Sequence, residues 1–369
     1  MAKRPGPVES MVISSRFWSG RRVFVTGHTG FKGAWLCLWL QRLGAQVAGY
    51  ALEPPTDPNL FTLAGVAGGM GDERGDVRDF ARLTAAVTKH RPEIVIHLAA
   101  QSLVRLSYCD PITTFTTNVM GTVNLLEALR RVDTVRAAII VTTDKCYSNQ
   151  EWVWGYREID ALGGHDPYSS SKACAELATV AYRDSFFPLA TYANHGVAVA
   201  SARAGNVVGG GDWALDRLVP DAMRAFITGQ CLEVRNPDSI RPWQHVLDPL
   251  AGYLQLAQRL VERGPEFACA WNFGPSSDGE QPVRALIERL IGLWGPGAAW
   301  RVDEREKPHE ANYLKLDCSQ ARSRLNWCPS ITFDQMLRLT VDWYRAQADG
   351  GDLRAMTLHQ INTEFPDAA

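Results

Sequence analysis

The chain has 369 residues, of which 46% are hydrophobic and 21% charged, and its formal net charge at pH 7 is −2. Such a chain can bury a large core as one big domain or two closely joined ones. Its small net charge argues against nucleic acid or a membrane surface as the main partner. No apolar run reaches the roughly 18 residues of a membrane-spanning helix, so we expect a cytoplasmic protein.

Residues 1–16 contain three turn-forming residues at positions 5–7 and lack a long apolar stretch. We therefore expect an irregular leader there rather than a signal peptide. The eight cysteines show no Cys-x-x-Cys pair and no histidine spacing typical of a metal site, so reduced thiols and no metal are expected.

A β-branched strand beginning near Val23 leads directly into Gly27, Gly30 and Gly33 and then into an apolar helix that ends at Gly44. The first glycine allows a tight turn, the second lets the backbone approach a pyrophosphate, and the third lets the helix pack against the strand. Glycine triplets also occur by chance in turns. The position of this one on a strand-to-helix junction, at the start of alternating strands and helices, favours a nucleotide-binding site.

The segments that follow the next two strands are expected at the adenosine end of a dinucleotide. Ala51 follows the strand predicted over 46–50, at the place where such folds usually present a carboxylate to the ribose. Glu53 comes soon after, but the prolines behind it fix an extended segment, so whether its carboxylate turns back is left open. Further on, either Asp76 or Asp79 is expected to cap a helix.

The alternation of helices and strands continues from there. A helix from Asp79 is followed by a strand over 94–98, and the small residues of 99–102 suit a backbone beneath a flat cofactor. A long helix is predicted over about 113–131. It contains Asn118, which is unfavourable inside a helix unless its amide has a hydrogen-bonding function.

A strand over 137–141 leads into Thr143, Asp144 and Lys145, at the sheet edge where such folds bind ligands. Asp144 and Lys145 can supply an acid and a base to one reaction. The ordinary alternative is a solvated ion pair at a strand end.

Tyr168 opens the next helix and Lys172 lies four residues later, so both side chains project from one helical face. Alone, such a pair is usually a surface pair. After the nucleotide motif and the strand-end Thr143, it indicates a catalytic pair in which the Lys172 charge lowers the pKa of the Tyr168 phenol.

The remaining elements are less regular. They are a strand over 197–201, a helix over 218–226, a loop at 241–246, a helix over 248–260 and a strand over 271–274. The whole pattern predicts an α/β fold, a doubly wound parallel sheet (Rossmann) with a smaller C-terminal substrate-binding lobe. The expected division is an irregular leader at 1–16, a dinucleotide-binding domain at 17–205 and 246–274, and a substrate-binding lobe at 206–245 and 275–369.

These motifs together resemble the extended short-chain dehydrogenase/reductases that act on nucleotide sugars, the NAD-dependent epimerases and dehydratases, over about residues 17–344. Within that family the chain most resembles the branch that dehydrates CDP-glucose. Its strand end has Lys145 where the broader sugar dehydratases have glutamate. The motifs that show the likeness are the glycine-rich turn at 25–33, Thr142 to Lys145, Tyr168 to Lys172, and the segments 203–213 and 241–246.

The resemblance implies NAD as the cofactor, a nucleotide sugar such as CDP-glucose as the substrate, and a homodimer or homotetramer. It implies catalytic roles for Thr143, Asp144, Lys145, Tyr168 and Lys172. The implied cofactor-binding residues are Gly27, His28, Thr29, Gly30, Phe31, Lys32, Asp76, Val77, Leu98, Ala99, Ala100, Gln101, Tyr168 and Lys172. The implied substrate-binding residues are Gln101, Thr143, Asn206, Arg241, His245 and His309.

In that chemistry Tyr168 takes the proton of the sugar 4-hydroxyl while carbon 4 gives its hydride to the nicotinamide. Lys145 as base and Asp144 as acid then eliminate the 6-hydroxyl, and the hydride returns to carbon 6. Arg241 and His245, and also Arg203, could bind pyrophosphate or order a loop, and the guanidinium fork favours substrate for Arg241.

Two other readings remain open. A nucleotide-sugar 4-epimerase uses the same tyrosine and lysine but needs no acid and base for elimination, so Asp144 and Lys145 count against it. A non-catalytic dinucleotide-sensing protein is disfavoured because both Tyr168 and Lys172 are present.

Overall fold

A seven-stranded parallel sheet forms the centre of the protein in the computed structural model, which describes residues 13–303 and 314–367. The strand order is β11-β6-β5-β4-β1-β2-β3, so the chain starts in the middle and reverses direction between β1 and β4. This order confirms the doubly wound α/β fold, which binds ligands outside the carboxyl ends of the strands at that reversal. The strands of this sheet are β1 (Arg22–Thr26), β2 (Gln46–Ala51), β3 (Gly71–Arg74), β4 (Ile94–His97), β5 (Ala137–Val141), β6 (Ala198–Arg203) and β11 (Ala270–Asn272).

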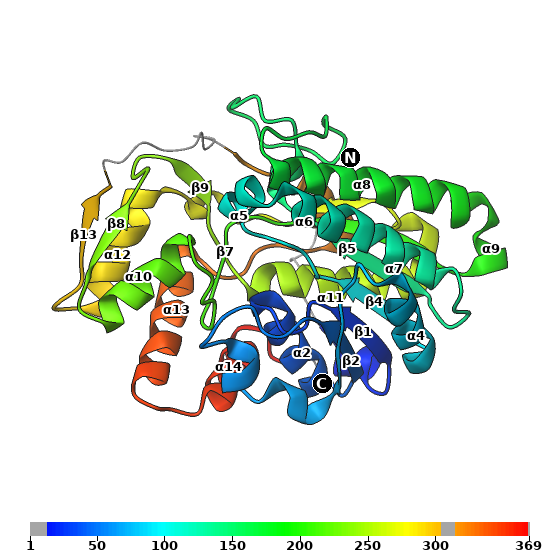
Figure 1. Ribbon diagram of the computed structural model, residues 1–369, viewed down its shortest axis with the longest axis horizontal. Coiled ribbons are helices and arrows are strands. Elements are labelled where there is room, and N and C mark those ends of the chain that lie inside the picture. The colour runs from blue at the N-terminus through cyan, green and yellow to red at the C-terminus, as the bar shows by residue number, and fades with distance from the viewer. Residues whose placement is uncertain (1–12, 304–313, 368–369) are drawn as a thin grey trace, which may run out of the picture.

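Helices cover both faces of the sheet (Figure 1). Alternate residues of β1 point to opposite faces, so Val23 and Val25 pack in one core and Phe24 packs in the other. One face is covered by α2 (Phe31–Arg42), α11 (Leu247–Arg263) and α14 (Leu353–Glu364), and the other by α4 (Phe80–His90), α7 (Gly121–Leu129) and α8 (Pro167–Phe186).

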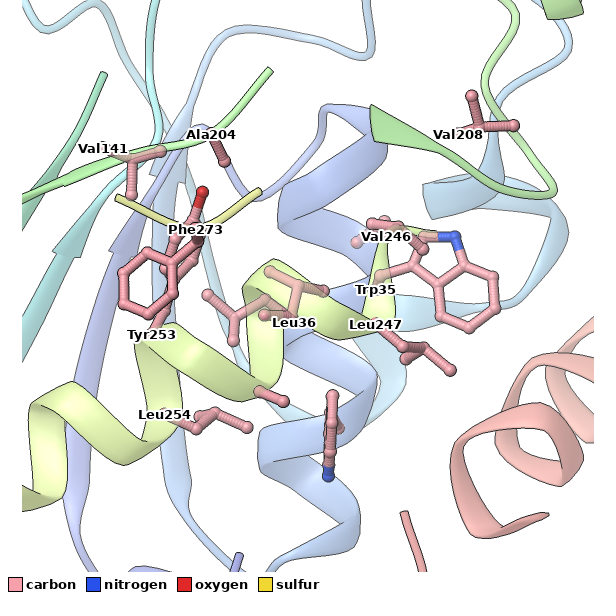
Figure 2. Packing of buried hydrophobic residues seen from close by; sticks show 14 of the residues in the cluster. Trp35, Leu36, Val141, Ala204, Val208, Val246, Leu247, Tyr253, Leu254 and Phe273 are labelled. Carbon is pink, nitrogen blue, oxygen red and sulfur yellow. The ribbon is translucent and has the colours of Figure 1, made fainter. Parts of the chain in front are cut away.

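The core between α2 and α11 lies directly below the glycine-rich turn. Figure 2 shows Trp35 and Leu36 of α2 close to Leu247 and Leu254 of α11, all of them fully buried. Trp35 also donates its indole N–H to the carbonyl of Gly210, at 2.9 Å. This packing fixes the start of α2 relative to the rest of the chain, because buried aromatic and aliphatic side chains leave little room for movement.

A smaller group of elements lies beside the sheet, at the left of Figure 1. It contains three two-stranded sheets, β7–β10, β8–β13 and β9–β12. Its strands are β7 (Val207–Val208), β8 (Cys231–Val234), β9 (Ile240–Pro242), β10 (Gln244–His245), β12 (Glu280–Pro282) and β13 (Ala299–Val302), and its helices include α10 (Leu218–Ile227), α12 (Val283–Trp294) and α13 (Phe333–Ala348). The remaining short helices are α1 (Ser15–Trp18), α3 (Leu60–Leu63), α5 (Val104–Cys109), α6 (Pro111–Phe115) and α9 (Tyr192–His195).

The prediction of a loop over 241–246 is wrong. That segment forms parts of two strands, β9 paired antiparallel with β12 and β10 paired parallel with β7. Both strands are two or three residues long and pair with distant segments. So short a strand has no alternating pattern of its own, because its stability comes from its partners.

The single helix predicted over 113–131 is interrupted. The chain forms α6, then one π-helical turn, η2 (Thr116–Met120), and then α7. Such turns are rare and are frequent at functional sites. In the described ranges, no helix is both long enough and apolar enough to cross a bilayer.

Candidate active site

A cavity of about 1200 Å³ opens at the carboxyl ends of the central strands, between the sheet and the smaller group of elements. Most of the residues expected to bind cofactor or substrate line it. They are Gly27, Thr29, Gly30, Phe31, Lys32, Asp76, Val77, Leu98, Ala99, Ala100, Gln101, Thr143, Lys145, Tyr168, Lys172, Asn206 and Arg241. The expected residues His28, Asp144 and His245 are not part of its lining, and His309 lies outside the described residues.

The glycine-rich turn can accept a flat, anionic ligand. Gly27 has φ +75°, and a Cβ there would lie 2.6 Å from the backbone nitrogen of Ala99. A Cβ on Gly33 would lie 2.2 Å from the carbonyl oxygen of Gly27. Gly30 is the N-cap of α2 and provides no capping side chain, so the amides of the first turn are available to a phosphate.

Two carboxylates at the opposite end of the cavity are held by arginines. Glu53 accepts a hydrogen bond from Nε of Arg74 at 3.1 Å. Asp76 binds the backbone and guanidinium of Arg78, and this hydrogen bonding lowers the pKa of Asp76. Of the two capping candidates, Asp79 caps α4 by accepting from Arg82 N at 3.0 Å.

The side chain of His28 does not line the cavity, and the place of His28 among the cofactor-binding residues stays a prediction. The imidazole is fully buried, packs edge-on against Phe61, and its Nε2 lies 2.7 Å from Oδ1 of Asp72. Burial lowers the pKa of His28. The ring lies against β2 at Gly49, where a Cβ would come within 2.3 Å of it. His28 therefore packs β1 against its neighbour strands.

The short helical turn η3 (Asp144–Cys146) follows β5 and brings three expected catalytic residues together. The Thr143 hydroxyl donates to Oδ1 of Asp144 at 2.8 Å and accepts from the backbone N–H of Lys145 at 3.3 Å. Nζ of Lys145 lies 3.3 Å from the same carboxylate oxygen. Asp144 is fully buried, whereas 32% of the Lys145 side chain is exposed. This pair is therefore not an ordinary solvated ion pair.

Asp144 is held in place from the other side by the glycine-rich segment after β6. Nδ2 of Asn206 donates to Oδ2 of Asp144 at 3.4 Å. A Cβ on Gly205 would come within 2.0 Å of the same carboxyl group. A glycine at this position leaves the space that the buried carboxyl group occupies, because any side chain at 205 would overlap it.

Tyr168 and Lys172 lie in the first turns of α8, which begins with an Asp166 cap and Pro167. Both are almost completely buried. Burial raises the pKa of the Tyr168 phenol to about 12, and its hydrogen bond with Thr143 acts in the opposite direction. Burial also lowers the pKa of the Lys172 ammonium to about 8.

The expected lowering of the Tyr168 pKa by Lys172 is therefore wrong for this structure. Loss of water around the phenol has the larger effect. Nζ of Lys172 donates to the carbonyl of Val141 at 3.2 Å, so the lysine is bound to the end of β5.

One turn later on α8, Glu176 forms a buried network that the sequence did not indicate. Its carboxylate accepts from the Thr142 hydroxyl, from Ser201 at 2.6 Å and from Arg203 at 2.8 Å. Arg203 also lies over the Tyr147 ring and is 2% exposed. Arg203 therefore orders the protein behind the strand ends and does not bind pyrophosphate.

Arg217 is a cavity residue that sequence reasoning missed. It donates to Asp212 at 2.8 Å and to the Ser102 hydroxyl at 2.9 Å, so it connects the segment after β4 with the segment before α10. Its charge helps to lower the pKa of Tyr168 against the effect of burial. Its position just before a helix gave no indication of this contact.

Arg241 lines the cavity from β9, but His245 does not. His245 is fully buried on β10, edge-on to Trp35, and burial lowers its pKa to about 3. His245 therefore presents no surface to the cavity, and its assignment to substrate binding stays a prediction.

Asn118, on the π-helical turn, holds the backbone of Gln101 with both ends of its amide. Oδ1 accepts from Gln101 N at 2.8 Å, and Nδ2 donates to Gln101 O at 3.0 Å and to the Ser171 hydroxyl at 2.8 Å. These bonds fix the segment after β4 to α8. They give the amide the function that its position within a helix requires.

Comparison with known proteins agrees with this arrangement. The family model described as GDP-mannose 4,6 dehydratase matches residues 24–267. A CDP-glucose 4,6-dehydratase of Salmonella typhimurium is 52% identical over 351 residues, which cover 95% of this chain and 98% of that protein. A dTDP-glucose 4,6-dehydratase of Xanthomonas campestris pv. campestris is 28% identical and covers 87% of this chain and 92% of its own.

Solved structures share the fold at lower identity. The dTDP-glucose 4,6-dehydratase of Bacillus anthracis, in complex with NAD, superposes with a TM-score of 0.73 at 20% identity, over 90% of this chain and 99% of that one. A UDP-glucose 4-epimerase of Thermus thermophilus, also with NAD, gives a TM-score of 0.75 at 24% identity, over 88% and 99%.

Proposed function

The chain belongs to the GDP-mannose 4,6-dehydratase family, and from this premise we propose that it converts CDP-glucose into CDP-4-keto-6-deoxyglucose and water, with tightly held NAD. The observation that carries the proposal is the buried Asp144 joined to Lys145 beside Tyr168. The CDP-glucose 4,6-dehydratase that is 52% identical to this chain supports CDP as the nucleotide of the substrate.

The cavity fits a dinucleotide. The uncapped first turn of α2 would bind the pyrophosphate, and the close approach of Gly27 to Ala99 leaves a flat floor for the nicotinamide half. Asp76 and Val77 would contact the adenosine. When bound, NAD supplies a reversible hydride acceptor, so no net oxidant is consumed.

Each proton in the reaction has a residue of this chain to move it. Tyr168, as the phenolate, would take the proton of the sugar 4-hydroxyl as carbon 4 loses its hydride. The hydrogen bond with Thr143 and the charge of Arg217 favour this phenolate against the effect of burial. The resulting ketone acidifies the hydrogen on carbon 5, which Lys145 removes as base. Asp144 gives its proton to the departing 6-hydroxyl, which leaves as water. Carbon 6 then receives the hydride and carbon 5 receives a proton from Lys145. Tyr168 finally releases the 4-hydroxyl proton and Asp144 takes one up, so that all three residues return to their starting states.

Substrate contacts are assigned to Gln101, Thr143, Asn206 and Arg241, with the guanidinium of Arg241 suited to a diphosphate. Residues 17–205 and 246–274 would hold the dinucleotide, and 206–245 with 275–369 would hold the sugar nucleotide. NAD is favoured over NADP because Arg74 is already paired with Asp72 and Glu53 and has no spare charge for a ribose phosphate.

The protein is proposed to act in the cytoplasm as a homodimer or homotetramer and to supply deoxysugar synthesis, including that of lipopolysaccharide. The exposed apolar side chains of α6 and α8 support an assembly through these helices. Ile112 is 77% exposed and Leu177 is 57% exposed.

The test is incubation of the protein with CDP-glucose and NAD, followed by the absorbance of a 4-keto-6-deoxy sugar in alkali. The expected result is product with CDP-glucose and much less with UDP-, GDP- or dTDP-glucose. Tyr168→Phe is the matched control and should bind NAD without turnover. Formation of a carbon 4 epimer, or no reaction with CDP-glucose, would contradict the proposal.

A further inference from the structure

Glu176 lies on α8 one turn after Lys172, and both side chains are buried on the same face of the helix. Its carboxylate accepts hydrogen bonds from the hydroxyls of Thr142 and Ser201 and from Nη2 of Arg203. Glu176 is not part of the cavity lining. Any effect of Glu176 on the reaction is therefore carried by the residues that it bonds or that its charge reaches.

The bond to Thr142 lies at the centre of the catalytic strand end. Thr142 follows Val141, the last residue of β5, whose carbonyl accepts from Nζ of Lys172 at 3.2 Å. Thr142 precedes Thr143, whose hydroxyl forms a hydrogen bond with Tyr168. The carboxylate on α8 therefore fixes the residue between the two that contact the catalytic side chains.

The same carboxylate reaches the neighbouring strand, β6. Ser201 donates to it at 2.6 Å and Arg203 at 2.8 Å. The backbone N–H of Thr142 also donates to the carbonyl of Ala202 at 2.8 Å. The end of β5, the end of β6 and α8 are thus joined by one buried group, and hydrogen bonds to an ionised group are stronger than neutral ones.

Glu176 stays ionised although it is fully buried. Burial acts to raise the pKa of Glu176, but the charge of Arg203 and the hydrogen bonds to the carboxylate lower this pKa below its usual value. Arg203 is held in turn, because it donates to the Tyr147 hydroxyl at 2.7 Å and to the carbonyl of Glu158 at 3.1 Å. A fixed negative charge therefore lies behind the catalytic residues at neutral pH.

Burial and Glu176 act on Lys172 in opposite directions. Burial lowers the pKa of Lys172 to about 8, and the negative charge of Glu176 acts to raise it. The other titratable groups that face Lys172 are Cys146 on η3, His97 on β4, Lys32 on α2 and Tyr168 on α8.

These other groups supply no lasting negative charge to Lys172. Burial raises the pKa of Cys146 and of Tyr168, so both hold their protons in the resting protein. Burial lowers the pKa of His97 to about 3, so its ring is neutral, and Lys32 can add only positive charge. Of these groups and Glu176, only Glu176 favours the ammonium form of Lys172.

We propose that Glu176 is a positioning residue for the catalytic pair, which fixes the end of β5 against α8 and keeps Lys172 in its cationic form. This inference rests on the proposed function. A cationic Lys172 favours the negative charge that the Tyr168 oxygen and the sugar 4-oxygen share during proton transfer. Glu176 therefore supports oxidation of carbon 4 without touching the substrate or the cofactor.

The test uses Glu176→Gln, which keeps the size of the side chain and removes its charge. This variant leaves the buried Arg203 without a counter-ion, which is strongly destabilising. Glu176→Gln combined with Arg203→Met removes both charges and is measured beside it. Thr179→Val is the matched control, because Thr179 is buried on the same helix but donates only to the carbonyl of Ala175 in that helix, at 2.7 Å.

The first measurement is the titration of Lys172, by NMR of protein with ¹³C-labelled lysine side chains and with Lys172→Met to assign the signal. The titration midpoint is expected to fall by about one pH unit in both Glu176 variants. This is the effect of a unit charge roughly 8 Å away at an effective dielectric constant of about 30. Thr179→Val should keep the wild-type midpoint.

The second measurement is the rate at which CDP-glucose reduces bound NAD in a single turnover, at pH 6 and pH 9. At pH 6 Lys172 is charged in every protein, whereas at pH 9 fewer molecules of the variants hold the charge. The wild-type rate divided by the variant rate is therefore expected to be about tenfold larger at pH 9 than at pH 6. A purely structural contact would lower the rate by the same factor at both pH values.

An unchanged Lys172 midpoint, or the same rate factor at pH 6 and pH 9, would overturn the inference. If Glu176→Gln does not give a native circular dichroism spectrum, the variant without both charges decides. Wild-type protein that does not reduce NAD with CDP-glucose would instead refute the proposed function. The Lys172 titration needs no substrate, so the two failures are distinguishable.

Discussion

Asp144 and Lys145 are adjacent in sequence, yet one is fully buried and the other is about one-third exposed. If Lys145 removes the carbon 5 proton, Lys145→Met should still oxidise carbon 4, because that step uses Tyr168 and Lys172. It should then stall before water leaves. We expect reduced cofactor and a 4-ketoglucose nucleotide to accumulate, with at least a hundredfold loss of final product, a typical contribution of a general base.

Absorbance of the reduced nicotinamide measures the oxidation of carbon 4. Exchange of deuterium from solvent into carbon 5 measures the removal of the carbon 5 proton separately. Lys145→Arg is the control for charge, since arginine keeps the positive charge but cannot act as a base at neutral pH. Normal product formation by Lys145→Met would show that another residue is the base.

The lowered pKa of Lys32 predicts a pH-dependent difference in stability between the wild type and Lys32→Met. The pKa of Lys32 falls from 10.5 to about 7 in the folded protein. The unfolded chain therefore binds one more proton between these values, and wild-type stability rises with pH in that range. Lys32→Met should be the more stable protein at pH 6, and its advantage should shrink toward pH 9.

Urea denaturation at the two pH values measures this difference, with Lys89→Met as control, because Lys89 is a 68% exposed lysine on α4. An advantage of Lys32→Met that grows with pH would show that the Lys32 ammonium is stabilised in the folded protein rather than penalised.

Residues whose roles depend on local spacing could be predicted from the sequence, and those whose positions depend on packing could not. Tyr168 and Lys172 lie on one helical face because four residues separate them, and both do line the cavity. His28 lies between two cavity residues in the sequence and His245 lies two residues after Trp243, which lines the cavity, but both histidine side chains are buried in the core. Nothing in a single sequence indicates which way a side chain turns next to a glycine-rich segment.

At the scale of elements, the π-helical turn η2 is the irregularity most closely connected with the site. Asn118→Leu would leave the partly buried N–H and C=O of Gln101 without these side-chain partners. The expected cost is about 2–4 kcal/mol of unfolding free energy for two such groups. Because the segment after β4 would then lack the bonds that fix it to the helix, kcat should also fall.

Urea denaturation and steady-state kinetics check this prediction. Thr116→Ala, in the same turn, removes a hydroxyl that bonds within its own helix and should cost less than about 0.5 kcal/mol. Equal effects of the two substitutions would contradict the special role of Asn118.

The sequence predicted the regular elements better than the irregular ones. Strand β5 was expected over 137–141 and has those bounds, because its residues form an unbroken apolar run between turns. The π turn was missed because residues 111–129 have a nearly continuous helical pattern. Strands β9 and β10 were missed because their partners are distant in sequence.

At the scale of the whole molecule, the proposed dimer follows from apolar side chains that remain exposed on α6 and α8. Ile112→Glu combined with Leu177→Glu should convert the protein to monomers, because two buried charges in each protomer would face an apolar interface. Sedimentation velocity at micromolar concentration measures the change.

Val302→Glu is the matched control, because this 46% exposed valine is on β13, away from α8 in Figure 1. It should leave the dimer intact. Wild-type protein that sediments as a monomer would contradict the proposed dimer.

The central claim is that one molecule of nucleotide sugar is first oxidised at carbon 4, then dehydrated, and finally reduced at carbon 6 within a single active site. The most direct test uses CDP-glucose with deuterium at carbon 4, with NMR and mass spectrometry of the product. We predict a 4-keto-6-deoxy sugar that contains the deuterium at carbon 6 and a solvent-derived hydrogen at carbon 5. Deuterium retained at carbon 4 of an epimerised sugar, or lost to solvent, would contradict the account.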